Sequence, residues 1–188
     1  MKTTSFFLTT AILLLFCLNT NAQNRIFEKG QFDVNLGIGV VPTYLMDGGK
    51  TITPPLSLGL DYLLNEKISV GLIYGHSVSE GVPELISDGV LTARNNHTSV
   101  FGLRGAMHVT KFDNWDIYGG FQLAYNHIKI DSKAPAQFDQ NKGIEPEKST
   151  VSYTGFVGAK YAFAKRFHAF SEVGFDISIF KMGIGIQL

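Results

Sequence analysis

Residues 180–188, FKMGIGIQL, have an apolar side chain at every second position, with Lys181, Gly183, Gly185 and Gln187 between them. Successive side chains of a β-strand point to opposite faces, so alternation over this length predicts a strand with one apolar and one polar face. The segment runs to the end of the sequence. We therefore expect it to be the terminal strand of a β-sheet protein.

Seven earlier segments alternate in the same way, so eight strands are expected in all. They are 32–40, 56–62, 68–75, 101–109, 115–126, 151–163 and 167–175. Long and short links alternate between them. The long links are 42–54, 79–95 and 131–149, and the short links are 65–67, 111–114 and 164–166. In an antiparallel sheet all three long links emerge on one side, which is typical of outer-membrane barrels. The last link on that side, 176–178, is atypically short.

Two further patterns favour a membrane barrel over a soluble, lipocalin-like barrel, which is the alternative. Charged residues stand in mid-strand on the polar face, namely Asp61, Arg104, Lys160, Glu172 and Lys181. Aromatic residues lie near both ends of the apolar face. They are Tyr62, Phe112, Trp115, Tyr161, Phe163 and Phe167 by the short links, and Tyr44, Tyr74, Tyr125 and Tyr153 by the long ones. Two aromatic girdles of this kind mark the two membrane interfaces.

On these segments, links and terminal strand, the chain resembles the small eight-stranded outer-membrane barrels of the OmpX and OmpA-transmembrane type. They belong to a broad Gram-negative group described as the outer membrane protein beta-barrel domain, which includes PorT-like proteins. The resemblance covers residues 23–188 and implies an all-β fold: a single antiparallel eight-stranded transmembrane barrel with long extracellular loops and short periplasmic turns. Such proteins usually end in an aromatic residue that the outer membrane insertion machinery recognises. This chain departs from that pattern, because it ends in Leu188.

The first 22 residues have the features of a secretory signal peptide. Lys2 gives a positive start, residues 6–18 are nearly all apolar, and Ala22 precedes the predicted cleavage site. The apolar run is shorter than the roughly 20 residues that a membrane-spanning helix needs. We therefore expect a signal peptide over residues 1–22 and one barrel domain over residues 23–188, located in the cell outer membrane.

Composition excludes some classes of function. Without the leader the chain has 16 − 1 = 15 basic and 16 acidic residues, which gives no electrostatic basis for binding nucleic acid. The single cysteine, Cys17, lies in the leader, so no internal disulfide is expected. A closed barrel in lipid supplies stability instead, because all its backbone groups are paired. The expected partners are outer membrane lipid and the insertion machinery.

The charges on the polar face predict an interior cluster. Eight strands enclose a space that side chains fill. We expect Arg104, Lys160, Glu172 and Lys181 to point into it, with Glu172 near both lysines and Lys181 also near Asp176. The cluster could be a salt-bridged structural plug or a gated ion path. The narrow interior favours the plug.

No catalytic, metal or cofactor site is predicted, because the histidines at 76, 97, 108, 127 and 168 have no metal-ligand spacing. His76-Ser77 and His97-Thr98-Ser99 are the only candidate Ser–His pairs for a lipid-modifying enzyme. Catalysis by such a pair depends on how the two side chains meet in space, not on their adjacency in the sequence. Function is therefore expected in the long loops, 42–54, 79–95 and 131–149, as a structural or surface-interaction role toward envelope components or external ligands. A lipid-modifying enzyme or a narrow channel is the alternative.

Overall fold

The computed structural model describes part of the chain in detail. The described residues are 28–43, 50–82, 84–85, 91–92, 94–112, 114–132 and 146–188. The predicted signal peptide, Tyr44 and much of each long link lie outside this part.

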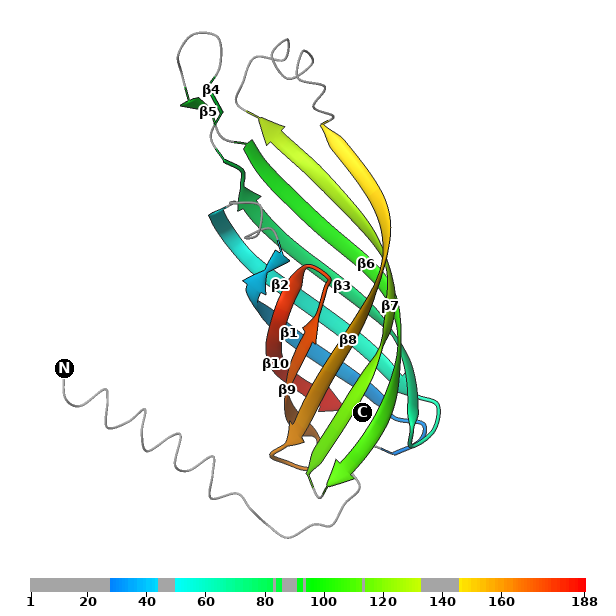
Figure 1. Ribbon diagram of the computed structural model, residues 1–188. Coiled ribbons are helices and arrows are strands. Elements are labelled where there is room, and N and C mark those ends of the chain that lie inside the picture. Colours follow the sequence, from blue (N-terminus) through cyan, green and yellow to red (C-terminus); the bar gives the residue numbers. More distant parts are fainter. Residues whose placement is uncertain are drawn as a thin grey trace, which may run out of the picture.

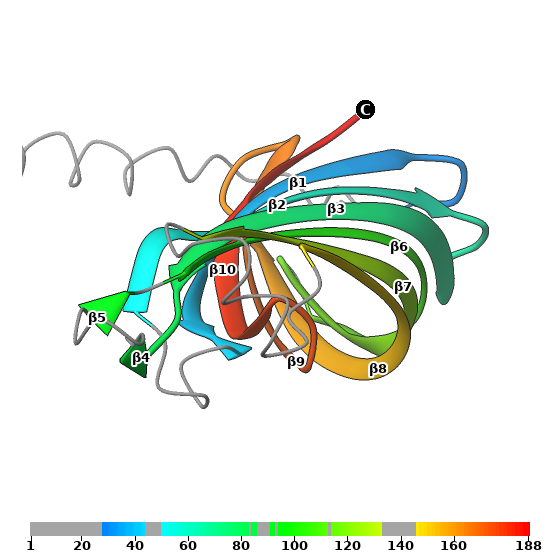
Figure 2. The ribbon, with the colours of Figure 1, turned by 90° about the horizontal axis from the view of Figure 1, so that it is seen from above.

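The described residues form ten β-strands, of which eight close into one antiparallel barrel (Figures 1 and 2). The strands are β1 (Phe32–Pro42), β2 (Lys50–Leu63), β3 (Ile68–Glu80), β4 (Glu84–Leu85), β5 (Leu91–Thr92), β6 (Arg94–Phe112), β7 (Trp115–Ser132), β8 (Glu147–Ala162), β9 (Phe167–Gly174) and β10 (Ser178–Gln187). The barrel order is β1-β10-β9-β8-β7-β6-β3-β2, and β4 pairs with β5. The predicted eight-stranded antiparallel barrel is confirmed. None of the described residues form a helix long and apolar enough to span a membrane.

The strands are longer than the sequence pattern indicated. Strands β6, β7 and β8 contain 19, 18 and 16 residues, and they continue well past the turn between β9 and β10 (Figure 1). The assignment of 50–54, 79–80, 94–95, 131–132 and 147–149 to loops was therefore wrong. The alternation of apolar with polar residues stops in these stretches, yet Ser and Thr recur in them, and β-branched Thr suits an extended backbone.

The register fixes the tilt of the strands. Paired residues followed around the barrel from Tyr153 lead back to β8 at Phe163, a shift of 163 − 153 = 10 residues. The path runs through Leu123, Leu103, Leu72, Leu60, Val34, Ile186 and Phe167. For eight strands this stagger corresponds to a tilt of about 40°. Ten residues of such a strand rise about 25 Å, which is the height of the apolar band of an outer-membrane barrel.

The apolar positions face outward, as the alternation predicted. Phe121 and Tyr153 are 80% and 89% exposed, whereas Arg104 and Glu172 on the other face are 9% and 3% exposed. A soluble barrel would turn its apolar face inward to escape water. The soluble, lipocalin-like alternative is therefore wrong.

Aromatic side chains lie at both ends of this outward face. At the end with the short turns, Phe32 packs against Tyr62, Trp115 against Tyr161 and Phe163 against Phe167, with ring centroids 4.9, 4.8 and 6.5 Å apart. At the other end, Tyr74, Phe101 and Tyr125 face one another in register across β3, β6 and β7, and we call these three residues the upper aromatic row. The predicted positions of Tyr44 and of the Phe112 side chain lie outside the described structure.

Candidate functional site

The polar positions of the strands meet in the barrel interior, where two linked groups of charges lie one above the other. The first group lies nearer the short turns. Asp33 and Asp61 are cross-strand neighbours on β1 and β2, and Lys160 reaches from β8 to bond Asp33 and to lie 3.9 Å from Asp61. His168 Nε2 lies 3.4 Å from the Asp33 carboxylate. The lysine therefore separates two carboxylates whose charges would otherwise repel each other.

The second group lies further along the barrel and centres on Glu172. Its carboxylate accepts hydrogen bonds from Arg104 at 2.7 Å, Lys181 at 2.6 Å and the Tyr118 hydroxyl at 3.1 Å. Lys181 also lies 3.3 Å from Asp176. The two groups are joined by Arg104, whose Nε is 3.4 Å from Asp61. A chain of ion pairs therefore runs through much of the barrel interior.

The structure places all four predicted cluster residues in the interior, but it changes their partners. Lys181 contacts Glu172 and Asp176 as expected. Lys160 was expected beside Glu172 and instead pairs with Asp33 and Asp61, while Arg104 takes the expected place at Glu172. Lys160 lies on β8 and Asp33 on β1, so the lysine crosses the lumen. A prediction that pairs charges only between neighbouring strands could not show this contact across the lumen.

Three acidic residues were left out of the predicted cluster: Asp33, Asp61 and Asp116. All three are buried, and Asp116 lies 2.6 Å from His108, whose other ring nitrogen is 3.0 Å from Ser69 Oγ. A signal was present in the sequence, since each acid occupies a polar position of an alternating segment and so had to point inward.

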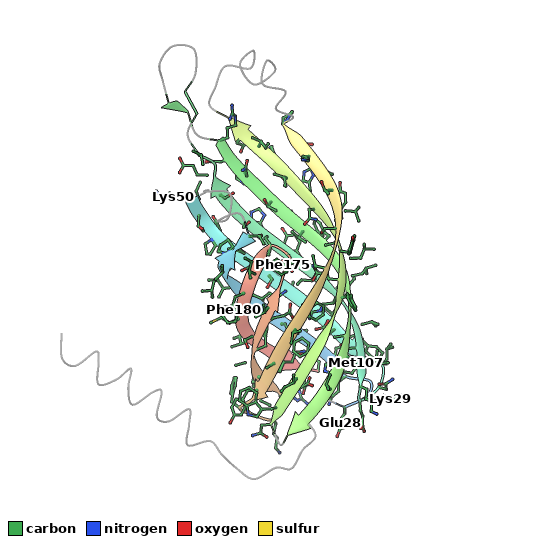
Figure 3. All side chains as sticks on the ribbon, in the orientation of Figure 1. Glu28, Lys29, Lys50, Met107, Phe175 and Phe180 are labelled. Atoms are coloured by element: carbon green, nitrogen blue, oxygen red, sulfur yellow. The ribbon has the colours of Figure 1, made fainter. Side chains whose placement is uncertain are left out.

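The turn between β9 and β10 folds across the interior at the end opposite the short turns. Ile177 in this turn is 5% exposed and packs with Val100 and Ala124 from the facing wall. Thr43 Oγ1 donates to the Asp176 carbonyl at 2.9 Å, and Gln122 donates to the Asp176 carboxylate at 3.3 Å. Figure 3 shows Phe175 of this turn lying well short of the far ends of β6, β7 and β8.

Little space is left inside the barrel. A cavity of about 10 Å³ lies between the two charge groups, which is room for about one water molecule. Its lining includes Asp61, Arg104, Tyr118, Glu172 and Lys181. Within the described residues no group of three or more His, Cys, Asp or Glu side chains could hold a metal ion. The interior geometry is that of paired charges packed around one small hydrated space.

A second polar feature lies on the outward face. His76 Nδ1 is 3.2 Å from Ser99 Oγ on the neighbouring strand, and His127 Nδ1 is 3.2 Å from Ser149 Oγ. His97 pairs with Asp131 at 3.2 Å. Of the candidate pairs read from the sequence, His76-Ser77 is wrong, because neighbouring residues of a strand point to opposite faces and Ser77 is buried inside. Ser99 instead meets His76 across the strands.

Comparison with known proteins agrees with this geometry. The family described as the outer membrane protein beta-barrel domain matches residues 9–184. No curated protein matches the chain.

Three solved structures share the fold. OprG from Pseudomonas aeruginosa is 13% identical with a TM-score of 0.59, covering 89% of this chain and 99% of OprG. The N-terminal barrel domain of P. aeruginosa OprF is 13% identical with a TM-score of 0.52, covering 85% and 98%. Ail from Yersinia pestis, in complex with the heparin analogue sucrose octasulfate, is 9% identical with a TM-score of 0.50, covering 85% and 99%.

Proposed function

The chain belongs to the outer membrane protein beta-barrel domain family, and from that membership we propose that it has a structural and surface-interaction role in the outer membrane. It contacts envelope components or external ligands at the end of the barrel opposite the short turns. The insertion machinery and outer membrane lipid are its partners during and after assembly.

The observation that carries this proposal is the length of the strands on one side of the barrel. A strand needs about 9–11 residues to span a membrane. Strands β9 and β10 have 8 and 10 residues, whereas β6 and β7 have 19 and 18. The excess lies beyond the upper aromatic row, so a wall of β3, β6, β7 and β8 stands out from the membrane. Rigid elements of this kind support binding loops.

The filled interior favours surface interaction over conduction. Arg104, Lys160 and Lys181 are each paired with buried carboxylates, and Ile177 covers them from the outer end. A hydrated ion needs more room than the space for one water molecule beside them. The role of this network is to hold the barrel together.

A binding role is compatible with this fold. Ail has the same fold at 9% identity, and its structure was determined with a heparin analogue bound. Sulfated polysaccharide is therefore a reasonable first ligand to test with this chain.

The test replaces residues 44–49 and 133–145 by two-residue Asn-Gly turns, alone and together, and leaves every barrel strand intact. Cells carrying each variant are compared with wild type for binding to heparin and to envelope protein extracts, and a heat-modifiable gel shift verifies the folded barrel. We expect folded variants that lose binding. A folded double variant that keeps every binding phenotype would refute a role for these loops.

A second candidate is a lipid-modifying enzyme, because His76–Ser99 and His127–Ser149 are Ser–His contacts on the outward face. Nucleophilic serine catalysis also needs an orienting group for the imidazole. In the described contacts the nearby carboxylate of Asp131 is paired with His97 instead. Lipid extracts from wild type and from Ser99→Ala and Ser149→Ala strains decide between the candidates: altered acylation in either variant supports the enzyme.

A further inference from the structure

A row of polar side chains crosses the outward face of four neighbouring strands. His76 on β3, Ser99 on β6, His127 on β7 and Ser149 on β8 face one another in register. The side chains are linked at 3.2 Å between His76 and Ser99 and at 3.2 Å between His127 and Ser149. The Tyr125 hydroxyl also donates to Ser149 at 2.8 Å. We call these four residues the polar row.

The position of the polar row is fixed relative to the membrane. It lies two residues along each strand from the upper aromatic row of Tyr74, Phe101 and Tyr125. Two residues of a strand tilted by about 40° rise about 5 Å. Aromatic girdles sit at the level of the lipid headgroups. The polar row therefore lies where the phosphates of the outer leaflet are found.

An apolar groove lies below the polar row on the same strands. It is lined by Val70, Leu103, Gly105, Phe121, Leu123 and Tyr153, together with Arg104 and Gln122. Gly105 forms the floor, and the nearest atom to the place where its Cβ would be is the Ser69 carbonyl oxygen at 4.0 Å. Leu103 is four residues from Ser99 on β6, or about 13 Å along the strand. A single lipid can therefore place an acyl chain in the groove and its headgroup at the polar row.

We propose that these two features form one binding site for a phosphate-bearing lipid of the outer leaflet. The headgroup phosphate accepts one hydrogen bond from each His–Ser pair of the polar row, from the imidazole Nε2 or from the hydroxyl according to the histidine tautomer, and an acyl chain lies in the groove over Gly105. The site belongs to the barrel wall and is independent of the proposed loop function. It would hold one lipid in a defined place rather than as part of the general lipid annulus.

Charged residues above the row complete the site. Lys129 on β7 and His97 on β6 lie in the next row outward, in register with Glu147 and Val78. Asp131 lies 3.2 Å from His97 and Glu147 faces Lys129, so each acid has a basic side chain beside it. A phosphate at the polar row has Lys129 as its nearest outward cation on β7. The order of groups from the groove upward is apolar, aromatic, hydrogen-bonding and charged, which matches the order along a phospholipid.

The experiment measures lipid binding to the intact detergent-folded barrel by native mass spectrometry. The probes are phosphatidylglycerol and diacylglycerol with the same acyl chains. Three variants are compared with wild type. The double variant His76→Gln/His127→Gln changes the polar row, and Gly105→Ile fills the groove. The third variant is Gly155→Ile. Gly155 is the matched control, because it is also outward-facing beside Phe121 but does not line the groove. A heat-modifiable gel shift verifies that each variant folds.

We expect wild type to retain phosphatidylglycerol about tenfold more tightly than diacylglycerol, the size of effect of one hydrogen bond to a charged group. The double histidine variant should lose this preference, and Gly105→Ile should weaken binding of both lipids. Gly155→Ile should bind like wild type. Equal binding of the two lipids by wild type, or equal effects of the two isoleucine variants, would overturn the proposal. Release of fatty acid from phosphatidylglycerol by wild type but not by Ser99→Ala would replace the binding site with an enzyme.

Discussion

Replacing Glu172 by glutamine tests whether the interior ion pairs stabilise the barrel. The Glu172 side chain is 3% exposed and accepts from Arg104, Lys181 and Tyr118. Removing one partner of a buried ion pair costs about 3–5 kcal/mol, because the other charge is left without its counter-ion. Arg104 and Lys181 keep contacts to Asp61 and Asp176 at 3.4 and 3.3 Å, so we expect a loss near the lower limit, about 3 kcal/mol.

The free energy of unfolding is measured by urea titration in lipid vesicles. Trp115 is the only tryptophan and lies on the outward face, so its fluorescence reports insertion and unfolding. Asp131→Asn is the control, because it breaks an exposed pair with His97 and should cost no more than about 1 kcal/mol. Adding Lys181→Met to Glu172→Gln removes the ammonium that has lost its closer carboxylate and keeps only the 3.3 Å contact to Asp176, so it should restore part of the loss. If Glu172→Gln unfolds at the same urea concentration as Asp131→Asn, the ion pairs do not stabilise the barrel.

Three further predictions use the same unfolding assay. Leu103→Arg and Val157→Arg on the lipid face should each lower the free energy of unfolding by about 2–4 kcal/mol. Ser152→Arg, near the outer end of the inner face, should lower it by less than about 1 kcal/mol. Equal losses would mean that the faces are assigned wrongly. Lys160→Met leaves Asp33 and Asp61 facing each other and should cost about 3–5 kcal/mol, a loss that Asp61→Asn in the same chain should partly reverse. If Asp61→Asn restores no stability, Lys160 does not act by separating the two carboxylates. Gly120→Ala drives a methyl group into the Gly105 carbonyl and should cost about 1–3 kcal/mol. Gly105→Ala has open space at its Cβ and should leave stability unchanged. A larger loss for Gly105→Ala than for Gly120→Ala would contradict the register between β6 and β7.

The faces of the strands could be read from the sequence because they depend only on local alternation. Phe101, Leu103 and Met107 had to share one side of their strand, and Arg104 and His108 the other, whatever the strand paired with. The membrane barrel followed from eight such segments, joined by alternating long and short links, with aromatic residues at both ends of the apolar face. The far ends of β6 and β8 could not be read in this way, because both of their faces are polar. On β7 the alternation changes phase, since Ile128 and Ile130 occupy the positions that are polar in the rest of the strand.

The partners within the interior could not be read from the sequence. They depend on the ten-residue stagger around the barrel, which brings Lys160 of β8 level with Asp33 of β1 across the lumen. The polar row was hidden for a related reason. His76 and Ser99 meet only because β3 pairs with β6 in one register, and the link between these strands gives no local signal for that register. Adjacency in the sequence suggested Ser77 instead, which the pleat turns inward.

The central claim is that the apolar positions of the strands face lipid and the polar positions face a closed interior. The accessibility of successive β6 positions to oxygen in the membrane tests this claim most directly. Residues 23–188 contain no cysteine, so single cysteines can be placed at each position from 101 to 108 and spin-labelled in lipid vesicles. Collision rates with oxygen, which dissolves in lipid, should alternate with a period of two. They should be high at 101, 103, 105 and 107 and low at 102, 104, 106 and 108. Rates that are high at the even positions, or equal at all eight, would contradict the barrel described here.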